Sequence, residues 1–117
     1  MTNGPVYKKS YQFSLLIISL YKIMISQREV VISKQLLASG TSVGANIREA
    51  SAASSRRDFI NKLMIASKEA RESKYWLELI KESKIVDYDL TEIISLNDEL
   101  IKILNSIIKT SQSRNKQ

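Results

Sequence analysis

The side chains best suited to chemistry in this sequence are cationic, and they suit the binding of phosphate better than a reaction. The net charge is +6, and residues 1–57 account for the whole excess, because Glu29 and Glu49 are their only acids. Lysine and arginine bind phosphate through charge and hydrogen bonds. The predicted nucleic-acid-binding residues are Lys34, Arg48, Arg56, Arg57 and Lys62, with Lys8 and Lys9 as outlying candidates.

Arg56 and Arg57 are the most informative of these residues, since they fall at the start of a predicted helix. The run from Ser55 to Asp58 matches a helix capping box with aspartate in the usual glutamate position. Positive charge there opposes the helix dipole, at ~0.3–1 kcal/mol for each exposed group. A polyanion or a partner's carboxylate would explain both arginines, and the alternative is that they are only solvated.

A second group of polar side chains recurs every three or four residues on one predicted helix. Its members are Ser39, Ser42, Asn46 and Glu49. They could form a polar site, but no activated nucleophile or base lies near them in the sequence. We therefore favour a structural hydrogen-bond network between helices, and we expect Asn97 to belong to the same class.

Most catalytic and metal chemistry is excluded by composition. The chain has neither cysteine nor histidine, so thiol nucleophiles, Ser-His-Asp triads and histidine-ligated metals are absent. Glu69 and Glu72 alternate with basic residues, which is typical of a solvated, salt-bridged face. The stretch from Gly40 to Gly44 lacks the Gly-Lys-Ser/Thr ending of a phosphate-binding loop. We expect no catalytic residue, no metal and no cofactor, and hence no enzyme activity.

Four helices must position these side chains. Apolar periodicity and caps predict one domain over residues 1–117, with helices at 6–25, 30–53, 56–84 and 89–110 and a frayed tail at 111–117. The second helix includes Gly40 and Gly44, whose small size would allow a neighbouring helix to approach closely. Short connections make successive helices antiparallel, so the fold class is all-α, an up-down-up-down four-helix bundle.

The helix predicted at 6–25 has more apolar surface than one bundle core requires. Tyr7, Tyr11, Leu15, Ile18 and Ile25 form one stripe, while a second set that includes Phe13 and Ile17 covers much of the rest. The apolar run is too short for a membrane span, contains Lys22 and precedes no cleavage site. We expect a cytoplasmic protein whose extra apolar surface is covered by another subunit.

The stretch from Gln35 to Ala50 resembles a family of bacterial four-helix-bundle proteins, those related to proteins encoded in intervening sequences of 23S rRNA genes. Residues 57–63 and 66–77 resemble the same family's third helix, with Glu72, Trp76 and Leu77 in matching places. The likeness extends from about Tyr7 to Ile108. It implies an antiparallel bundle that assembles into a ring, typically a homopentamer. A related branch, the accessory variability protein of diversity-generating retroelements, is a basic ring that binds nucleic acid and a reverse transcriptase.

Two functions are consistent with these observations. The first is a non-enzymatic, ring-forming bundle that binds RNA or DNA through basic side chains, with little sequence specificity. The second is a protein-protein scaffold or adaptor without nucleic-acid affinity, whose net charge is incidental.

Overall fold

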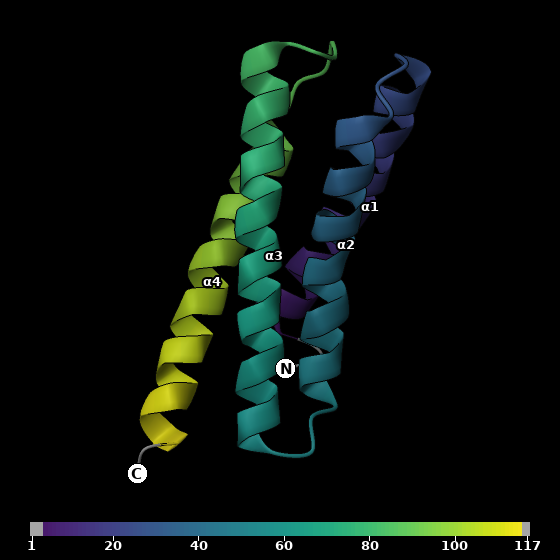
Figure 1. Ribbon diagram of the computed structural model, residues 1–117. Helices are drawn as coiled ribbons and strands as arrows, with labels where there is room; N and C mark the ends of the chain where they lie inside the picture. The colour runs from purple at the N-terminus through teal and green to yellow at the C-terminus, as the bar shows by residue number, and fades with distance from the viewer. Residues whose placement is uncertain (1–3, 116–117) are drawn as a thin grey trace.

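The computed structural model describes residues 4–115, and these form four α-helices joined by short connections (Figure 1). The helices are α1 (Pro5–Ser26), α2 (Val31–Ser51), α3 (Arg56–Ser83) and α4 (Thr91–Asn115). Each runs antiparallel to its neighbour in sequence, and α1 also packs against α4. The bundle measures 51 × 22 × 22 Å. The predicted all-α class is confirmed, and the described residues include no strand.

The predicted boundaries differ from the observed ones mainly in α4. This helix starts at Thr91, because Asp89 caps it by accepting the Thr91 backbone N–H at 2.9 Å. Hydrogen bonds from the Thr91 hydroxyl and N–H hold the pKa of Asp89 below its ordinary value. At the other end α4 continues to Asn115, beyond the predicted end at residue 110. Ser111 is buried there, so part of the expected frayed tail is packed helix; residues 116 and 117 lie outside the described part of the chain.

Helices α1 and α2 approach each other closely where α2 carries its two glycines. A Cβ atom built on Gly40 would lie 2.7 Å from Cγ1 of the fully buried Ile17. One built on Gly44 would lie 3.2 Å from the Ser14 hydroxyl and 3.3 Å from the Ser10 carbonyl oxygen. The predicted packing reason for these glycines is thereby observed: α1 occupies the space that side chains at both positions would need.

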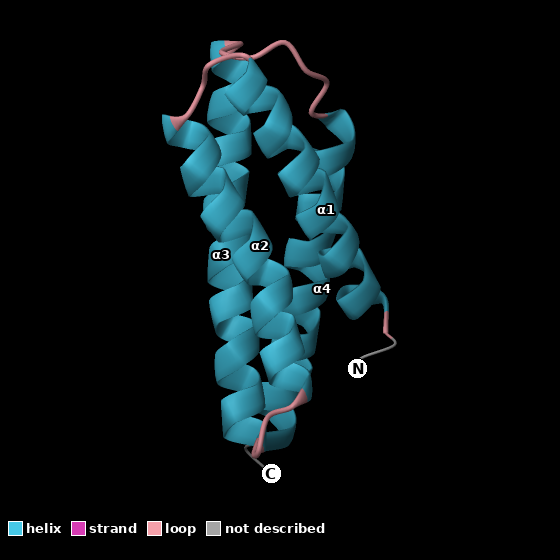
Figure 2. Cartoon of the chain, turned by 90° about the vertical axis from the view of Figure 1, so that its right-hand side faces the viewer, coloured by secondary structure: helices cyan, strands magenta, loops and turns pink. Residues whose placement is uncertain are grey.

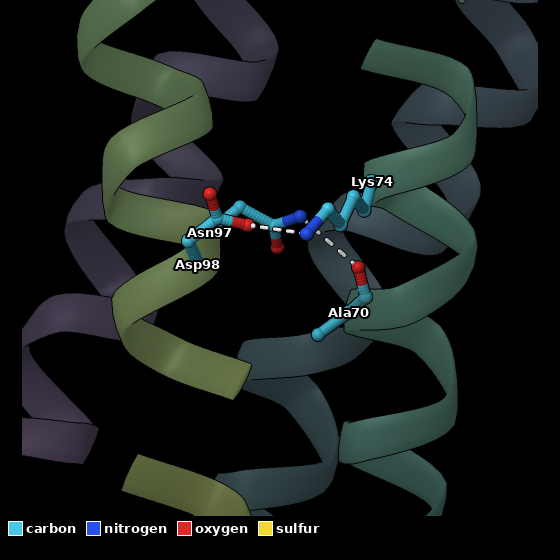
Figure 3. A network of polar contacts seen from close by, with 4 residues as sticks. All are labelled: Ala70, Lys74, Asn97 and Asp98. Atoms are coloured by element: carbon cyan, nitrogen blue, oxygen red, sulfur yellow. Dashed lines mark hydrogen bonds and ion pairs between the residues drawn. The ribbon is translucent and has the colours of Figure 1, made fainter. Parts of the chain in front are cut away.

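Polar contacts link α2 to α3 and α3 to α4, two of them in the core and one at the surface. Ser39 on α2 lies 2.9 Å from the hydroxyl of Ser73 on α3. Between α3 and α4, the side-chain amide of the fully buried Asn97 donates to the Ala70 carbonyl oxygen at 3.1 Å. An ion pair joins Lys74 to Asp98 at 3.2 Å, one residue further along α4 (Figure 3). These contacts join particular turns of neighbouring helices and so determine how the helices are aligned along their axes. Apolar side chains alone would not determine this alignment.

The expected network of Ser39, Ser42, Asn46 and Glu49 needs correction. Of the four, only Ser39 bonds to another helix. Ser42 donates to the Ala38 carbonyl and Asn46 to the Ser42 carbonyl, both within α2, and Glu49 is exposed. The reason is orientation: Ser39 points toward α3, whereas Ser42 and Asn46 are partly exposed and Glu49 is exposed.

The start of α2 depends on a carboxylate that the sequence analysis did not single out. Glu29 is buried and accepts the backbone N–H groups of Val31, Ile32 and Ser33 at 3.2, 2.9 and 2.8 Å. These are donors that a helix start leaves without intrahelical partners. The negative charge also lies at the positive end of the helix dipole. One side chain therefore satisfies most of the first turn of α2.

We expect Glu29→Ala to lower the free energy of unfolding by ~1.5–3 kcal/mol, because hydrogen bonds to a charged acceptor are lost. Urea denaturation followed by circular dichroism measures this. Glu29→Gln is the matched control: it keeps an acceptor oxygen without the charge and should lose less. Equal stability of the alanine variant and the parent would contradict the role of Glu29.

We expect Gly40→Ala to be destabilising although alanine favours helices. Overpacking costs ~1–3 kcal/mol, which exceeds the helix-propensity gain of up to ~1 kcal/mol. Gly44→Ala should be milder, since the nearest side-chain atom belongs to the smaller Ser14. Urea denaturation of a double-mutant cycle with Ile17→Ala should show favourable coupling, because Ile17→Ala removes the clash. A Gly40→Ala variant as stable as the parent would show that the close approach can relax.

A basic end of the bundle as candidate nucleic-acid interface

The antiparallel topology collects cationic side chains at one end of the rod. Helix α3 begins at this end, α2 and α4 finish there, and α1 begins on the same side but stops short of it. We call it the basic end. Its cationic residues are Arg48, Arg56, Arg57, Lys62, Lys109 and Arg114. The acids on the same turns are only Glu49 and Asp58.

The opposite end has a different balance of charge. Its acids are Glu29, Glu78, Glu82, Asp87, Asp89 and Glu92, and its cations are Lys22, Arg28, Lys34, Lys81 and Lys84. A charge asymmetry that appears in the sequence as a difference between halves therefore becomes, in the fold, a difference between the two ends of the bundle.

Three of the five predicted nucleic-acid-binding residues come together at the basic end: Arg48, Arg56 and Arg57 are all exposed there. Lys62 follows about two turns further along α3 and is partly buried. Lys34 is exposed but lies near the start of α2, ~21 Å from Arg48 along the helix. The structure thus separates Lys34 from the other four.

Arg56 and Arg57 occupy the first turn of α3, as the capping pattern predicts. The Ser55 hydroxyl accepts the Asp58 backbone N–H at 3.0 Å, which confirms the cap. Within residues 4–115, neither arginine makes an ion pair. The remaining N–H groups of the first helical turn lie beside two guanidinium groups without an ion pair in the described residues, an arrangement that favours an anion.

Arg48 lies against aromatic rings of the neighbouring helix. Its guanidinium carbon is 5.1 Å from the centroid of the Tyr7 ring and 5.2 Å from that of Tyr11. Both distances fall within the range of cation-π attraction. The tyrosines hold this charge at the α1–α2 surface, so the position of the Arg48 side chain depends on α1 as well as on α2.

The two outlying candidates behave differently. Lys8 is exposed, whereas Lys9 pairs with Glu99 on α4 and so has a compensating charge. Because Lys9 pairs with Glu99, Lys8 lies near Leu100, ~22 Å before the end of α4, so we assign neither lysine to the basic end.

Lys109 and Arg114 were not among the predicted nucleic-acid-binding residues. Both lie on the last turns of α4, close to or within the segment that was expected to fray. The signal that could have found them is the apolar stripe of α4: Leu104, Ile107 and Ser111 continue its spacing, and Ser111 is buried. A serine is small enough to be buried at such a position, but as a polar residue it gives no sign of burial in the sequence.

Comparison with known proteins gives a family and a solved relative. The family model described as "23S rRNA-intervening sequence protein" matches residues 2–106. The chain belongs to this family. A crystal structure of a protein of unknown function from the S23 ribosomal protein family of Bacteroides thetaiotaomicron is 51% identical, with a TM-score of 0.85. The match covers 89% of this chain and 98% of that one.

These findings confirm the resemblance drawn from the α2 and α3 sequences, and the relative supports the fold along nearly its whole length. A comparison with curated proteins gives no match. Among the described helices of this family member, none combines the length and the apolar character needed to cross a membrane.

The contact between Arg48 and the tyrosines predicts a measurable coupling. In a double-mutant cycle of Arg48→Gln and Tyr11→Leu, we expect a coupling free energy of ~0.5–1 kcal/mol from urea denaturation. Tyr21→Leu serves as the control partner, because Tyr21 lies further along α1 and should give no coupling with Arg48→Gln. Coupling of the same size for both tyrosines would contradict a specific contact.

Proposed function

We propose that this protein binds RNA or DNA through its basic end and catalyses no reaction. The observation that carries the proposal is the convergence of Arg48, Arg56 and Arg57 with Lys109 and Arg114, from α2, α3 and α4, on one end of the rod. The family's name, which refers to an intervening sequence of 23S rRNA, agrees with a nucleic-acid context. A cytoplasmic location is part of the same proposal.

The interaction would be with phosphates. Exposed guanidinium and ammonium groups neutralise backbone charge and release condensed counterions. The first turn of α3 adds backbone N–H groups beside Arg56 and Arg57. Phosphate contacts carry little base information, so we expect weak sequence preference and a steep dependence on salt.

The test is a charge reversal at the start of α3. We expect Arg56→Glu/Arg57→Glu to weaken binding to a fluorescent structured RNA or duplex DNA by at least ~tenfold at low salt. The slope of log affinity against log salt should fall by ~1.8, at ~0.9 for each lost phosphate contact on duplex DNA. Fluorescence anisotropy at low and near-physiological salt measures both effects.

The matched control is Lys81→Glu/Lys84→Glu, which makes the same change of net charge at the opposite end of the bundle. It should retain most of the affinity. Equal losses in the two variants would indicate a response to net charge alone, and unchanged binding in the arginine variant would refute the assignment of the site.

We further propose that the protein self-associates through the outer stripe of α1, in a ring that the family resemblance suggests is a pentamer. Tyr11, Leu15, Ile18 and Ile25 are 52%, 51%, 39% and 36% exposed. Tyr11, Leu15 and Ile18 follow one another at helical spacing on one face, and the exposed Lys22 separates them from Ile25. Exposed apolar surfaces of this kind mark interfaces. A second copy of the chain would remove this stripe from water.

We expect Leu15→Lys/Ile18→Lys to reduce the assembled mass toward that of a single chain while leaving the helical content unchanged. Size-exclusion chromatography with light scattering gives the mass. The control is Gln12→Lys/Ser19→Lys, which adds the same charges to exposed polar positions of α1 and should preserve the assembly. A parent protein that is already monomeric would refute this part of the proposal.

A protein-protein scaffold is the second candidate, and exposed apolar residues on α3 favour it. Met64, Tyr75 and Leu79 are 48%, 57% and 37% exposed, and none of them is needed for the bundle core. If the assembled protein failed to bind RNA or DNA even at low salt, this surface would become the leading candidate for a partner protein.

A further inference from the structure

A groove runs beside the basic end because α1 stops short of the end of α4. Lys9 on α1 pairs with Glu99 on α4, and the two helices are antiparallel. Pro5, the first residue of α1, therefore lies near Ile103, and α4 continues to Asn115, ~18 Å beyond. Figure 2 shows the described part of α1 ending well before the last turns of the bundle. Residues 4–115 leave the seam between α3 and α4 uncovered there.

The groove has apolar walls and two cationic side chains. Its volume is about 850 Å³, and its walls include Val6 from α1, Phe59 from α3 and Ile103 and Ile107 from α4. Arg56 and Arg114 complete the lining, with serine and threonine hydroxyls between them, and no acidic residue takes part. Neither arginine makes an ion pair within the described residues.

We propose that this groove binds a long-chain carboxylate, with the hydrocarbon tail against Phe59, Ile103 and Ile107 and the carboxylate held by Arg56 and Arg114. Guanidinium groups pair with carboxylates through charge and parallel hydrogen bonds. The first turn of α3, next to Arg56, supplies N–H donors that favour the same anion. The volume falls within the ~300–1,000 Å³ range of small-molecule sites.

The walls favour a fatty carboxylate over a nucleotide. A nucleotide would place its phosphate near the arginines, but the polar edges of its base would then face Val6, Ile103 and Ile107. Buried polar groups without partners are costly, whereas a hydrocarbon chain has none to satisfy. The site therefore goes beyond the proposed nucleic-acid function, with which it shares Arg56 and Arg114.

The direct test is calorimetric titration of the protein with octanoate, decanoate and dodecanoate, each below its micelle concentration. We expect one ligand per chain and a rise in affinity of up to ~fourfold for each added methylene, as expected for burial of hydrocarbon. Decyltrimethylammonium is the control for apolar binding without the arginines, because it has the same tail with the opposite charge. Equal binding of the two ten-carbon probes would overturn the proposal.

Two variants locate the site. Ser106→Trp fills the groove from an exposed position of α4 and should weaken dodecanoate binding at least ~tenfold by removing the space for the tail. Ser95→Trp is the matched control, an exposed serine of the same helix three turns away that should bind normally. Arg56→Gln/Arg114→Gln should weaken carboxylate binding without weakening that of decyltrimethylammonium, whose like-charge repulsion it removes. Circular dichroism verifies that each variant is folded.

The outcomes separate this proposal from its rivals. Equal loss in Ser106→Trp and Ser95→Trp, or undiminished binding in Ser106→Trp, would overturn the assignment to the groove. Binding only to vesicles that contain anionic lipid, with no uptake of the free carboxylate, would indicate a membrane contact and would overturn it as well. Ser106→Trp leaves the net charge unchanged, so its RNA affinity reports separately on the nucleic-acid function.

Discussion

The close approach of α1 to α2 is the constraint on which the rest of the structure depends. Ile17 fills the space over Gly40, and Ser10 and Ser14 lie against Gly44, so the two helices can meet in only one register. That register brings Tyr7 and Tyr11 to Arg48. It also determines how far α1 reaches along α4, and hence how much of the α3–α4 seam the described residues leave uncovered. A packing detail in the middle of the bundle thus determines the surface at one end.

The other seams are specified by polar contacts instead of close approach. Ser39 meets Ser73 between α2 and α3, and Asn97 reaches the Ala70 carbonyl between α3 and α4. The Oδ1 atom of Asn97 finds no hydrogen-bond partner within residues 4–115, so the side chain gives up part of its hydrogen bonding in this position. An apolar residue would pack there at a lower cost but would allow α4 to slide. We interpret Asn97 as a register-fixing residue, as its place in the apolar stripe of α4 predicted.

Much of the fold could be predicted because helical periodicity and caps are local signals. Even the glycine-containing part of α2 was predicted as helix, since the alternative was a loop in the middle of a small bundle. The end of α4 was not predictable from composition, because a polar Ser111 gave no sign that it would be buried. For the site, the sequence showed which charges exist but not which ones meet. Arg114 joins Arg56 only through the antiparallel return of α4, and the groove depends on the relative lengths of α1 and α4, which no local pattern encodes.

The separation of charge along the rod affects how the molecule is oriented when it approaches a charged partner. In an antiparallel bundle the helix dipoles largely cancel in pairs, so the external field comes from side chains. A body with one positive end turns that end toward a polyanion before contact, because the field exerts a torque over its 51 Å length. Cyclic symmetry about an axis parallel to the bundles would place every basic end on the same side. Such an assembly would have one cationic face and one nearly neutral face, and it would lie flat on an anionic surface with a single orientation.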